Sequence, residues 1–329
     1  MEKVEELRAP EQRLRIVFDN ILFATDCSPS SEVALRYALA LAHRYDGKVY
    51  AVHAATMDAD EPVVSEAKQK ALQAARPVAL SCARDLRESG QLKSVRHEIL
   101  IGEEDAPTVN LPKSGEFDLV VSGVGYREKQ AMVLAPVVEE AIRRSQCPAL
   151  SVSPEVSGHA DGELKSVLFA TDFSPESLEA SRYAVSLAQE YQARLTLLHV
   201  VEQAEPQLLD EKSQMATPFK LWLGKLVPDE ARLWCDLEFT VEFGRPAERI
   251  LQAAWENHAD LIVVGARGFG RMTSPGLNVT KVMSNATCPV LTVSGVLDSD
   301  RQKRFWRAAA AAWESQGGVR IAGVELSHE

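Results

Sequence analysis

One long internal repeat restricts the fold of this chain more than any other feature of its sequence. Residues 21–54 read ILFATDCSPSSEVALRYALALAHRYDGKVYAVHA, and residues 167–200 read VLFATDFSPESLEASRYAVSLAQEYQARLTLLHV. The two segments align without a gap, so that Asp172 lies 146 residues after Asp26. Further on, FDLVVSGVG matches ADLIVVGARG, and CPALSVS matches CPVLTVS. The chain therefore contains two copies of one folding unit, called unit one and unit two below.

Each unit alternates short apolar runs with stretches of helical periodicity. The runs are ILFAT, KVYAVHA, RHEILI, DLVVSGV and ALSVS in unit one, and VLFAT, RLTLLHV, EFTVEF, DLIVVGA and VLTVS in unit two. Runs that are apolar almost throughout are typical of parallel strands covered on both faces. Ser28-Pro29 and Ser174-Pro175 predict helix starts, because serine caps a helix and proline suits its first turn. We expect an α/β fold of two doubly wound, mostly parallel five-stranded sheets, Rossmann-like, with helices on both faces.

The length of 329 residues suits two domains, each able to bury its own core. We predict domains over residues 1–155 and 156–296, followed by a tail over 297–329. The tail contains DSDRQKRFWRAAAAAWESQGG, which predicts an Ala-rich helix with Trp306, Ala310 and Trp313 on one face. This helix either docks on the chain's own domains or contacts a partner, and the final VRIAGVELSHE is a candidate edge strand.

Composition excludes several classes of function. The formal net charge of −11 opposes nonspecific binding to nucleic acid, and no apolar window is long enough to cross a membrane. The cysteines are odd in number and form no CxxC pair, which argues against a metal site and favours a reducing, cytoplasmic location. They are Cys27, Cys82, Cys147, Cys235 and Cys288.

The motifs at the strand ends resemble those of a known family. They are ATD-x-S-P after the first strand, L-H-V at the end of the second, G-x-P before a helix, D-L-I-V-V-G-x-R-G, and C-P-V-L before the last strand. Over about residues 20–153 and 166–294 they resemble the universal stress protein family. The resemblance implies a stress-response role and intramolecular pairing of the two units, in the manner of the dimer that single-unit relatives form. A further homodimer, or a protein partner bound through the tail, stays open.

Some members of that family bind ATP through G-x2-G-x9-G-[S/T], where glycine amides and a hydroxyl hold the phosphates. Unit two supplies Gly265, Gly268 and Gly276. It departs from the pattern at Leu277, which stands where Ser or Thr is expected, and the stretch between the last two glycines is seven residues instead of nine. Thr273, Ser274 and Thr280 are candidate replacements for the hydroxyl. Arg267 is a better candidate phosphate ligand than Lys281.

The resemblance assigns adenosine contacts in unit two to Ala170, Asp172 and Val200. The expected cofactor is ATP or another adenine nucleotide, with Mg²⁺ if ATP binds. For Asp172, capping of the following helix is the alternative role.

Unit one departs further from the nucleotide pattern. Its corresponding positions are Ala24, Asp26, Ala54 and Gly123. Tyr126 stands at the second glycine position, where its ring would crowd a phosphate, and Ala135-Pro136 replaces the last Gly-Ser pair. We expect a degenerate nucleotide motif in this unit.

Other conspicuous residues have structural interpretations. His53 and His199 stand at equivalent strand ends, where a packed histidine is more common than a catalytic one. Cys147 and Cys288 each precede a proline, which favours a structural role. The segment LWLGKLVPDEARLWCD, with Trp222 and Trp234, predicts a helix or lid packed against unit two.

Two classes of function remain open from the sequence. The protein is either a stress factor regulated by adenine nucleotide binding in unit two, or an interaction scaffold that binds no nucleotide and acts through its paired units. No catalytic constellation is apparent, so an enzymatic role beyond slow ATP hydrolysis is not expected.

Overall fold

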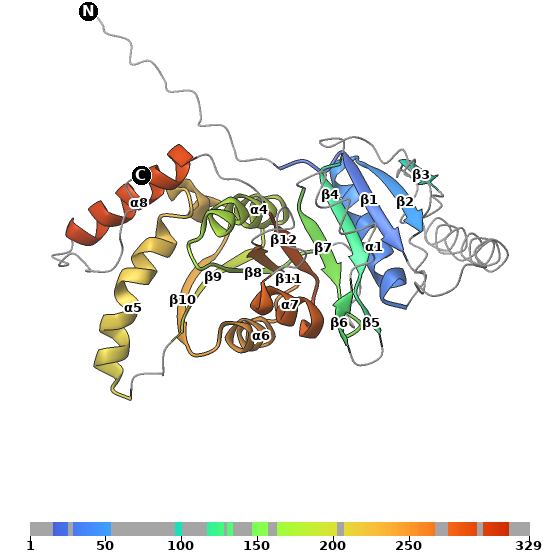
Figure 1. Cartoon of the computed structure of the whole chain (residues 1–329). Coiled ribbons are helices and arrows are strands. Elements are labelled where there is room, and N and C mark those ends of the chain that lie inside the picture. Colours follow the sequence, from blue (N-terminus) through green and yellow to red (C-terminus); the bar gives the residue numbers. More distant parts are fainter. Residues whose placement is uncertain are drawn as a thin grey trace, which may run out of the picture.

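The computed structural model describes residues 16–25, 29–53, 96–100, 117–127, 130–133, 147–156, 163–202, 207–266, 276–294 and 299–315. One sheet of ten strands runs through both units (Figure 1), in the order β10-β9-β8-β11-β12-β7-β4-β1-β2-β3. Unit one contributes β1 (Asn20–Thr25), β2 (Lys48–His53), β3 (Arg96–Leu100), β4 (Leu119–Gly123) and β7 (Ala149–Val152). Unit two contributes β8 (Ser166–Ala170), β9 (Arg194–Val201), β10 (Leu237–Phe243), β11 (Leu261–Gly265) and β12 (Val290–Val293). All ten predicted strands are therefore confirmed.

Both halves of the sheet have the same topology. In each, the unit's own strands run in the spatial order third, second, first, fourth, fifth, and every pair within a half is parallel. The chain reverses its direction of travel across the sheet after the first three strands, which is the doubly wound arrangement. The predicted fold class is confirmed in both units.

The two halves meet at β7 and β12, the one antiparallel pair of the ten-stranded sheet. Leu150 lies opposite Leu291 in this pair. These leucines hold equivalent positions of the repeat, each two residues after the proline of a Cys-Pro pair. An approximate twofold axis therefore passes between them, and the expected intramolecular pairing takes the form of one continuous sheet.

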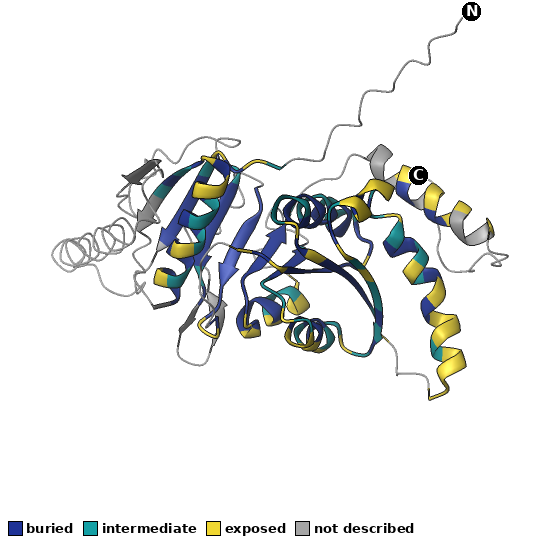
Figure 2. Cartoon of the chain, turned by 180° about the vertical axis from the view of Figure 1, so that it is seen from behind, coloured by how far each residue is buried: buried dark blue, intermediate teal, exposed yellow. Residues whose placement is uncertain are grey.

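Helices cover both faces of the sheet. α1 (Pro29–Tyr45) and α4 (Pro175–Tyr191) pack on one face, and α6 (Pro246–Glu256) and α7 (Leu277–Asn285) pack on the other. Along β8 the side chains alternate, with Phe169 in the first core and Leu168 in the second. Figure 2 shows buried strands between helices whose outer faces are exposed. Coverage of both faces explains why the strands are apolar almost throughout.

The start of α4 follows the sequence prediction. Ser174 is the N-cap, and its Oγ accepts a hydrogen bond from the Ser177 amide at 3.3 Å. Pro175 occupies the first turn, where its missing N–H costs nothing. Pro29 opens α1 in the same way, while Ser28 lies outside the described residues.

The segment around Trp222 packs against unit two, as predicted. It forms α5 (Leu209–Gly224) and a 3₁₀ turn, η1 (Asp229–Leu233), and the side chain of Trp222 is buried in the core. Trp234 is half-buried against the same core.

The tail helix, α8 (Ser299–Ser315), docks on the chain's own second unit, beside α5. Its contact face contains Phe305 and Ala309, which are buried, whereas Ala310 is exposed. The prediction that Ala310 belongs to the docking face is therefore wrong, and the neighbouring Ala309 lies on that face instead. The side chains of those two tryptophans, and the candidate strand VRIAGVELSHE, lie outside the described residues.

A short antiparallel hairpin in unit one was not predicted. It is formed by β5 (Gly125–Arg127) and β6 (Gln130–Val133), directly after β4. Tyr126, at the position of the second motif glycine, is the middle residue of β5. The unit thus has strand pairing where the nucleotide pattern requires a glycine loop.

None of the helices in the described part of the chain is sufficiently long and apolar to cross a membrane. The cytoplasmic location and the domain limits at residues 155 and 296 stay predictions.

Candidate functional site

A pocket of about 140 Å³ lies at the carboxyl ends of β8, β9 and β11, between the sheet, α6 and α7. β8 and β11 are adjacent in the sheet, and the chain leaves them in opposite directions. This is the topological switch point at which parallel α/β sheets bind ligands. Four residues predicted from the resemblance line the pocket together, although they are up to 95 residues apart in sequence. They are Ala170, Asp172, Val200 and Gly265.

Asp172 lies at the start of α4, and its contacts bear on the capping role that the sequence left open. Its Oδ1 accepts hydrogen bonds from the Ser174 amide at 2.9 Å and from the Ser177 hydroxyl at 2.7 Å. Asp172 therefore stabilises the turn that begins α4. The residue is also exposed and lines the pocket. Contact with a ligand stays a prediction.

Gly265 is required by packing whether or not a ligand binds. A Cβ atom built on this residue would lie 2.3 Å from the backbone nitrogen of Ser177, at the start of α4. Gly123 has the same relationship to α1 in unit one, where a Cβ would lie 2.5 Å from the backbone nitrogen of Ser31. Both glycines allow a helix start to approach a strand end closely. The first motif glycine thus has a structural role in each unit.

The amino terminus of α7 borders the pocket. Gly276 is its N-cap residue and, having no side chain, leaves the first amides of the helix without a side-chain hydrogen bond. Asn278 and Val279 from the first turn line the pocket. Leu277 is 73% exposed, so the position where the family pattern has a hydroxyl faces solvent. Helix amino termini favour anions, because their amides are unpaired and the helix dipole is positive there.

The remaining predicted phosphate ligands are placed only in part. Arg267, Gly268, Thr273 and Ser274 lie outside the described residues. Lys281 is exposed on α7 and, like Thr280, does not line the pocket.

In unit one the predicted residues are only partly described. Ala24 is buried at the end of β1, and Gly123 ends β4. Asp26 and Ala54 lie outside the described residues. The unit-one site therefore stays a prediction.

Sequence reasoning missed several lining residues. Ser177, Glu202, Ile250 and Asn278 all face the pocket. Only Ser177 carried a usable signal, since Ser31 stands at the equivalent position of unit one. The others come from segments where the two units differ.

The pocket is acidic in the part of the chain that the structure describes. Asp172 and Glu202 line it, and none of the described lining residues is Lys, Arg or His. Carboxylates accept hydrogen bonds from ribose hydroxyls or a base amino group, but they repel unscreened phosphates. The described lining thus suits a nucleoside better than a triphosphate.

His199 lies on the opposite face of the sheet from the pocket, in an aromatic cluster. Its ring stacks on Phe219 at 4.5 Å and lies 4.8 Å from the ring of Phe173. Its Nδ1 lies 2.8 Å from the carbonyl oxygen of Thr171, so this nitrogen carries the proton and donates. Burial lowers the pKa of His199. These contacts fit the packed histidine favoured by the sequence, whereas the side chain of His53 lies outside the described residues.

The cysteines before proline are buried thiols. Burial raises the pKa of Cys288 to about 12, which keeps the thiol protonated and unreactive. Cys147 is also buried and forms no disulfide, so both fit a structural role.

Comparisons with known proteins agree with the repeat. The model of the universal stress protein family matches residues 18–153 and 163–294. A universal stress protein of Thermus aquaticus is 37% identical over 134 residues, which cover 39% of this chain and 98% of that protein. One of Methanocaldococcus jannaschii is 30% identical over 145 residues, covering 39% of this chain and 81% of that protein.

Among solved structures, a universal stress protein from Archaeoglobus fulgidus has a TM-score of 0.58. It is 19% identical, and the match covers 84% of this chain and 98% of that one. At this identity the likeness bears on the fold alone. The two family matches together span most of the chain, which therefore belongs to the universal stress protein family as a tandem member.

Proposed function

We propose that this tandem universal stress protein is regulated by an adenine nucleotide bound in unit two. Family membership supports the broader stress-response role. The observation that carries the finer proposal is that the four residues predicted from the family resemblance line one pocket at the switch point of the sheet. They are Ala170, Asp172, Val200 and Gly265.

In this proposal the adenosine part occupies the space between Ala170, Val200 and α6, and Asp172 accepts from a ribose hydroxyl or the base. The phosphate lies at the amino terminus of α7, near Gly276. Arg267 and Gly268 are the further proposed phosphate ligands. Since Leu277 supplies no hydroxyl and two carboxylates line the pocket, we expect AMP to bind more tightly than ATP.

Mg²⁺ would enter with ATP instead of occupying a site of its own. No three His, Cys, Asp or Glu side chains gather to hold a metal ion within the described ranges. Phosphate oxygens and water commonly hold Mg²⁺ together with one or two carboxylates. Glu202 is the better candidate ligand, because Oδ1 of Asp172 already accepts two hydrogen bonds. The proposal includes no catalytic step.

Calorimetry with AMP, and with ATP in the presence and absence of Mg²⁺, tests this function. Val200→Phe places a ring in the pocket and should abolish binding. Leu233→Ala, on a side chain that is 79% exposed and does not line the pocket, is the control and should bind as the wild type does.

A second pair of variants tests the phosphate end. Leu277→Ser restores the hydroxyl of the family pattern at an exposed position and should increase affinity for ATP more than for AMP. Leu277→Ala removes the same side chain without adding a hydroxyl, and it should leave the ratio of ATP affinity to AMP affinity unchanged. Absence of saturable heat with every nucleotide at millimolar concentration would reject the proposal.

That negative result would favour the alternative, an interaction scaffold that binds no nucleotide. The continuous sheet supports this reading, because it fixes the two units as one body with a single arrangement of outer surfaces.

A further inference from the structure

Asp172 and Phe173 are neighbours in the chain, but their side chains lie on opposite sides of it. Asp172 lines the pocket of about 140 Å³ in unit two, called the unit-two pocket below, whereas the ring of Phe173 is buried in the first core. At the end of β9, Val200 and His199 divide in the same way, because successive side chains of a strand point to opposite faces. The pocket and the aromatic cluster around Phe173 are therefore back to back and share two stretches of backbone.

The ring of Phe173 joins three elements of unit two. It lies 4.8 Å from the ring of His199 in β9 and 5.8 Å from that of Trp222 in α5, which it meets edge-on. Its third contact is with the tail helix, where Phe305 of α8 stacks on it at 6.0 Å. α8 therefore covers the far side of the turn over residues 171–174, whose near side lines the pocket.

This turn holds Phe173 in an unusual backbone conformation. Its φ angle is 59°, in the left-handed region that bulky residues seldom adopt and keep only where their surroundings impose it. Two hydrogen bonds fix the turn on the pocket side. The Phe173 amide donates to Oγ1 of Thr171 at 3.0 Å, and the Ser174 amide donates to Oδ1 of Asp172 at 2.9 Å. Loss of the packing on the other side would free Phe173 to leave this conformation and would displace the Asp172 carboxylate with it.

The two units differ at this position. Where unit two has Phe173 in ATDFSP, unit one has Cys27 in ATDCSP. The ring on which α8 stacks is thus present in the unit that keeps more of the glycine pattern, and the corresponding residue of the other unit carries a thiol.

The contact face of α8 is small. Of the side chains of α8 that the structure describes, Phe305 and Ala309 alone are buried. An element with few buried apolar contacts opens locally at a lower cost than the core does. Docked and undocked α8 are therefore two accessible states of unit two.

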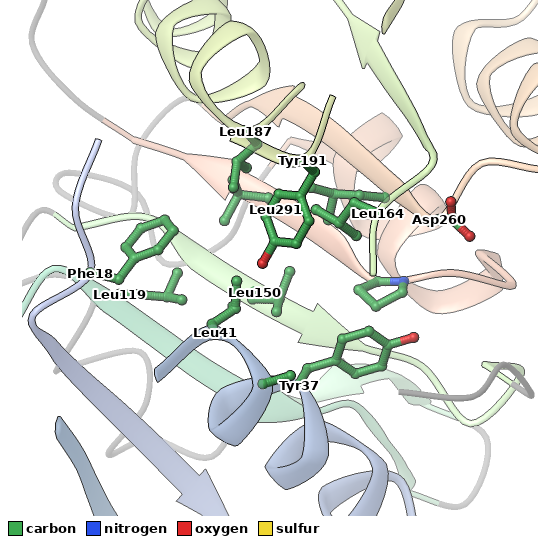
Figure 3. A pocket seen from close by; sticks show the side chains of 13 residues that line it. Phe18, Tyr37, Leu41, Leu119, Leu150, Leu164, Leu187, Tyr191, Asp260 and Leu291 are labelled. Atoms are coloured by element: carbon green, nitrogen blue, oxygen red, sulfur yellow. The ribbon is translucent and has the colours of Figure 1, made fainter. Parts of the chain in front are cut away.

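The junction between the units is not part of this arrangement. A small apolar space lies there between α1 and α4 (Figure 3), and its volume of about 30 Å³ has room for about one water. Leucines from both units surround it, among them Leu41, Leu150 and Leu291. Neither Phe173 nor Phe305 lines this space. The path from α8 to the unit-two pocket thus lies within unit two.

We propose that docking of α8 on Phe173 holds the Asp172 carboxylate in the position that binds ligand, so that the tail helix regulates the unit-two pocket. The inference rests on the proposed function for the class of ligand, an adenine nucleotide, whereas the coupling itself is a property of the turn. By linkage, the factor by which docked α8 raises ligand affinity equals the factor by which bound ligand favours docking.

Amide hydrogen exchange of the full-length protein tests the coupling without ligand. Asp172→Ala removes the acceptor of the Ser174 amide and should speed exchange along α8 roughly 5-fold or more, as expected for coupled sites. Glu202→Ala removes the other carboxylate of the pocket lining and should leave exchange along α8 unchanged. The amides of β11 are the internal reference, because unfolding of the whole unit would speed their exchange as well.

Calorimetry with AMP tests the effect of α8 on the pocket. Ala309→Glu places a carboxylate in the buried contact face, so it should undock α8 and lower AMP affinity roughly 5-fold or more. Ala310→Glu makes the same change at the exposed neighbouring residue and should bind AMP as the wild type does. In the reverse direction, saturating AMP should slow exchange along α8 of the wild type.

The outcomes separate the coupling from the nucleotide function. Equal exchange along α8 in Asp172→Ala and Glu202→Ala would overturn the coupling. Equal AMP affinity in Ala309→Glu and Ala310→Glu would also overturn it, with Phe305→Ala as the undocking variant if Ala309→Glu fails to fold. Absence of AMP binding by the wild type would reject the nucleotide function, and exchange in Asp172→Ala would still decide the coupling.

Discussion

Arg44 of α1 lies against Glu190 of α4 across the junction of the two units, with its Nε 3.4 Å from Oε1. The Arg44 guanidinium also donates to the Glu190 backbone carbonyl and stacks on the ring of Tyr191. Arg44 and Glu190 hold equivalent positions of the repeat, each directly before a tyrosine. Identical units would place the same residue on both sides of the axis. The two copies have instead diverged into oppositely charged partners, which favours pairing of unit one with unit two over pairing of like units.

Reversing one of these charges should weaken the junction. Arg44→Glu places two carboxylates together, but the side chains are 39% and 28% exposed, so we expect a loss of only about 1 kcal/mol in the free energy of unfolding. The double variant Arg44→Glu/Glu190→Arg should recover most of that loss in urea unfolding. Arg36 is an exposed residue of the same helix. An equal loss of unfolding free energy in Arg36→Glu would contradict this account.

The first and third motif glycines should differ sharply in their tolerance of a methyl group. Gly265→Ala places a Cβ atom 2.3 Å from the backbone nitrogen of Ser177. It should destabilise the protein by roughly 1–3 kcal/mol. Gly276→Ala meets no atom within 4 Å and should unfold at nearly the wild-type temperature. Thermal unfolding of both variants, without nucleotide, provides the comparison. Similar melting temperatures would show that the close approach of α4 to β11 can relax.

Phe305 should be the residue that holds α8 in place. Its ring stacks on that of Phe173, with centroids 6.0 Å apart and an angle of 18° between the rings. Phe305→Ala should make the docking of α8 less favourable by roughly 3 kcal/mol, because it removes a buried ring from the contact. Amide hydrogen exchange should become faster along α8 but not in β8. Ala310→Ser, on the exposed side of the same helix, is the control; unchanged exchange in Phe305→Ala would mean that other contacts hold the helix.

Burial of His199 predicts a stability that falls at acidic pH. Its folded-state pKa lies below the ordinary 6.5, so the unfolded chain binds more protons in this range. The free energy of unfolding should therefore decrease as pH falls through about 6.5, until the folded-state pKa is reached. His199→Asn keeps a donor near Thr171 but does not titrate, and should show a smaller decrease between pH 8 and 5. If the unfolding free energy of the wild type and of His199→Asn fell equally between pH 8 and 5, the pH dependence would not come from His199.

Local signals in the sequence predicted the elements of this fold reliably. The strand runs, the cap at Ser174 and the helix starts all depend on residues that are neighbours in the chain. The candidate nucleotide pocket was predictable in outline for a related reason, because Asp172 and Gly265 both follow apolar runs and parallel strands bring their carboxyl ends to one edge.

Tertiary structure alone revealed the other features. No motif distinguishes β7 and β12 as the strands that join the halves, since β3 and β10 also end the sheet of their unit. The docking face of α8 depends on where Phe173 lies, which the helical periodicity of the tail does not encode. Tyr191 and Tyr45 are equivalent in sequence, yet the Tyr191 ring lies under the guanidinium of Arg44 from the other unit, whereas the Tyr45 ring packs edge-on against Phe18.

The sequence by itself determined two copies of one doubly wound α/β unit and the edge of the sheet where a ligand site is expected. Only the tertiary structure decided how the copies join and which side chains meet across the axis. The physical reason is that secondary structure follows from contacts a few residues apart, whereas the junction depends on surfaces that neither copy completes alone.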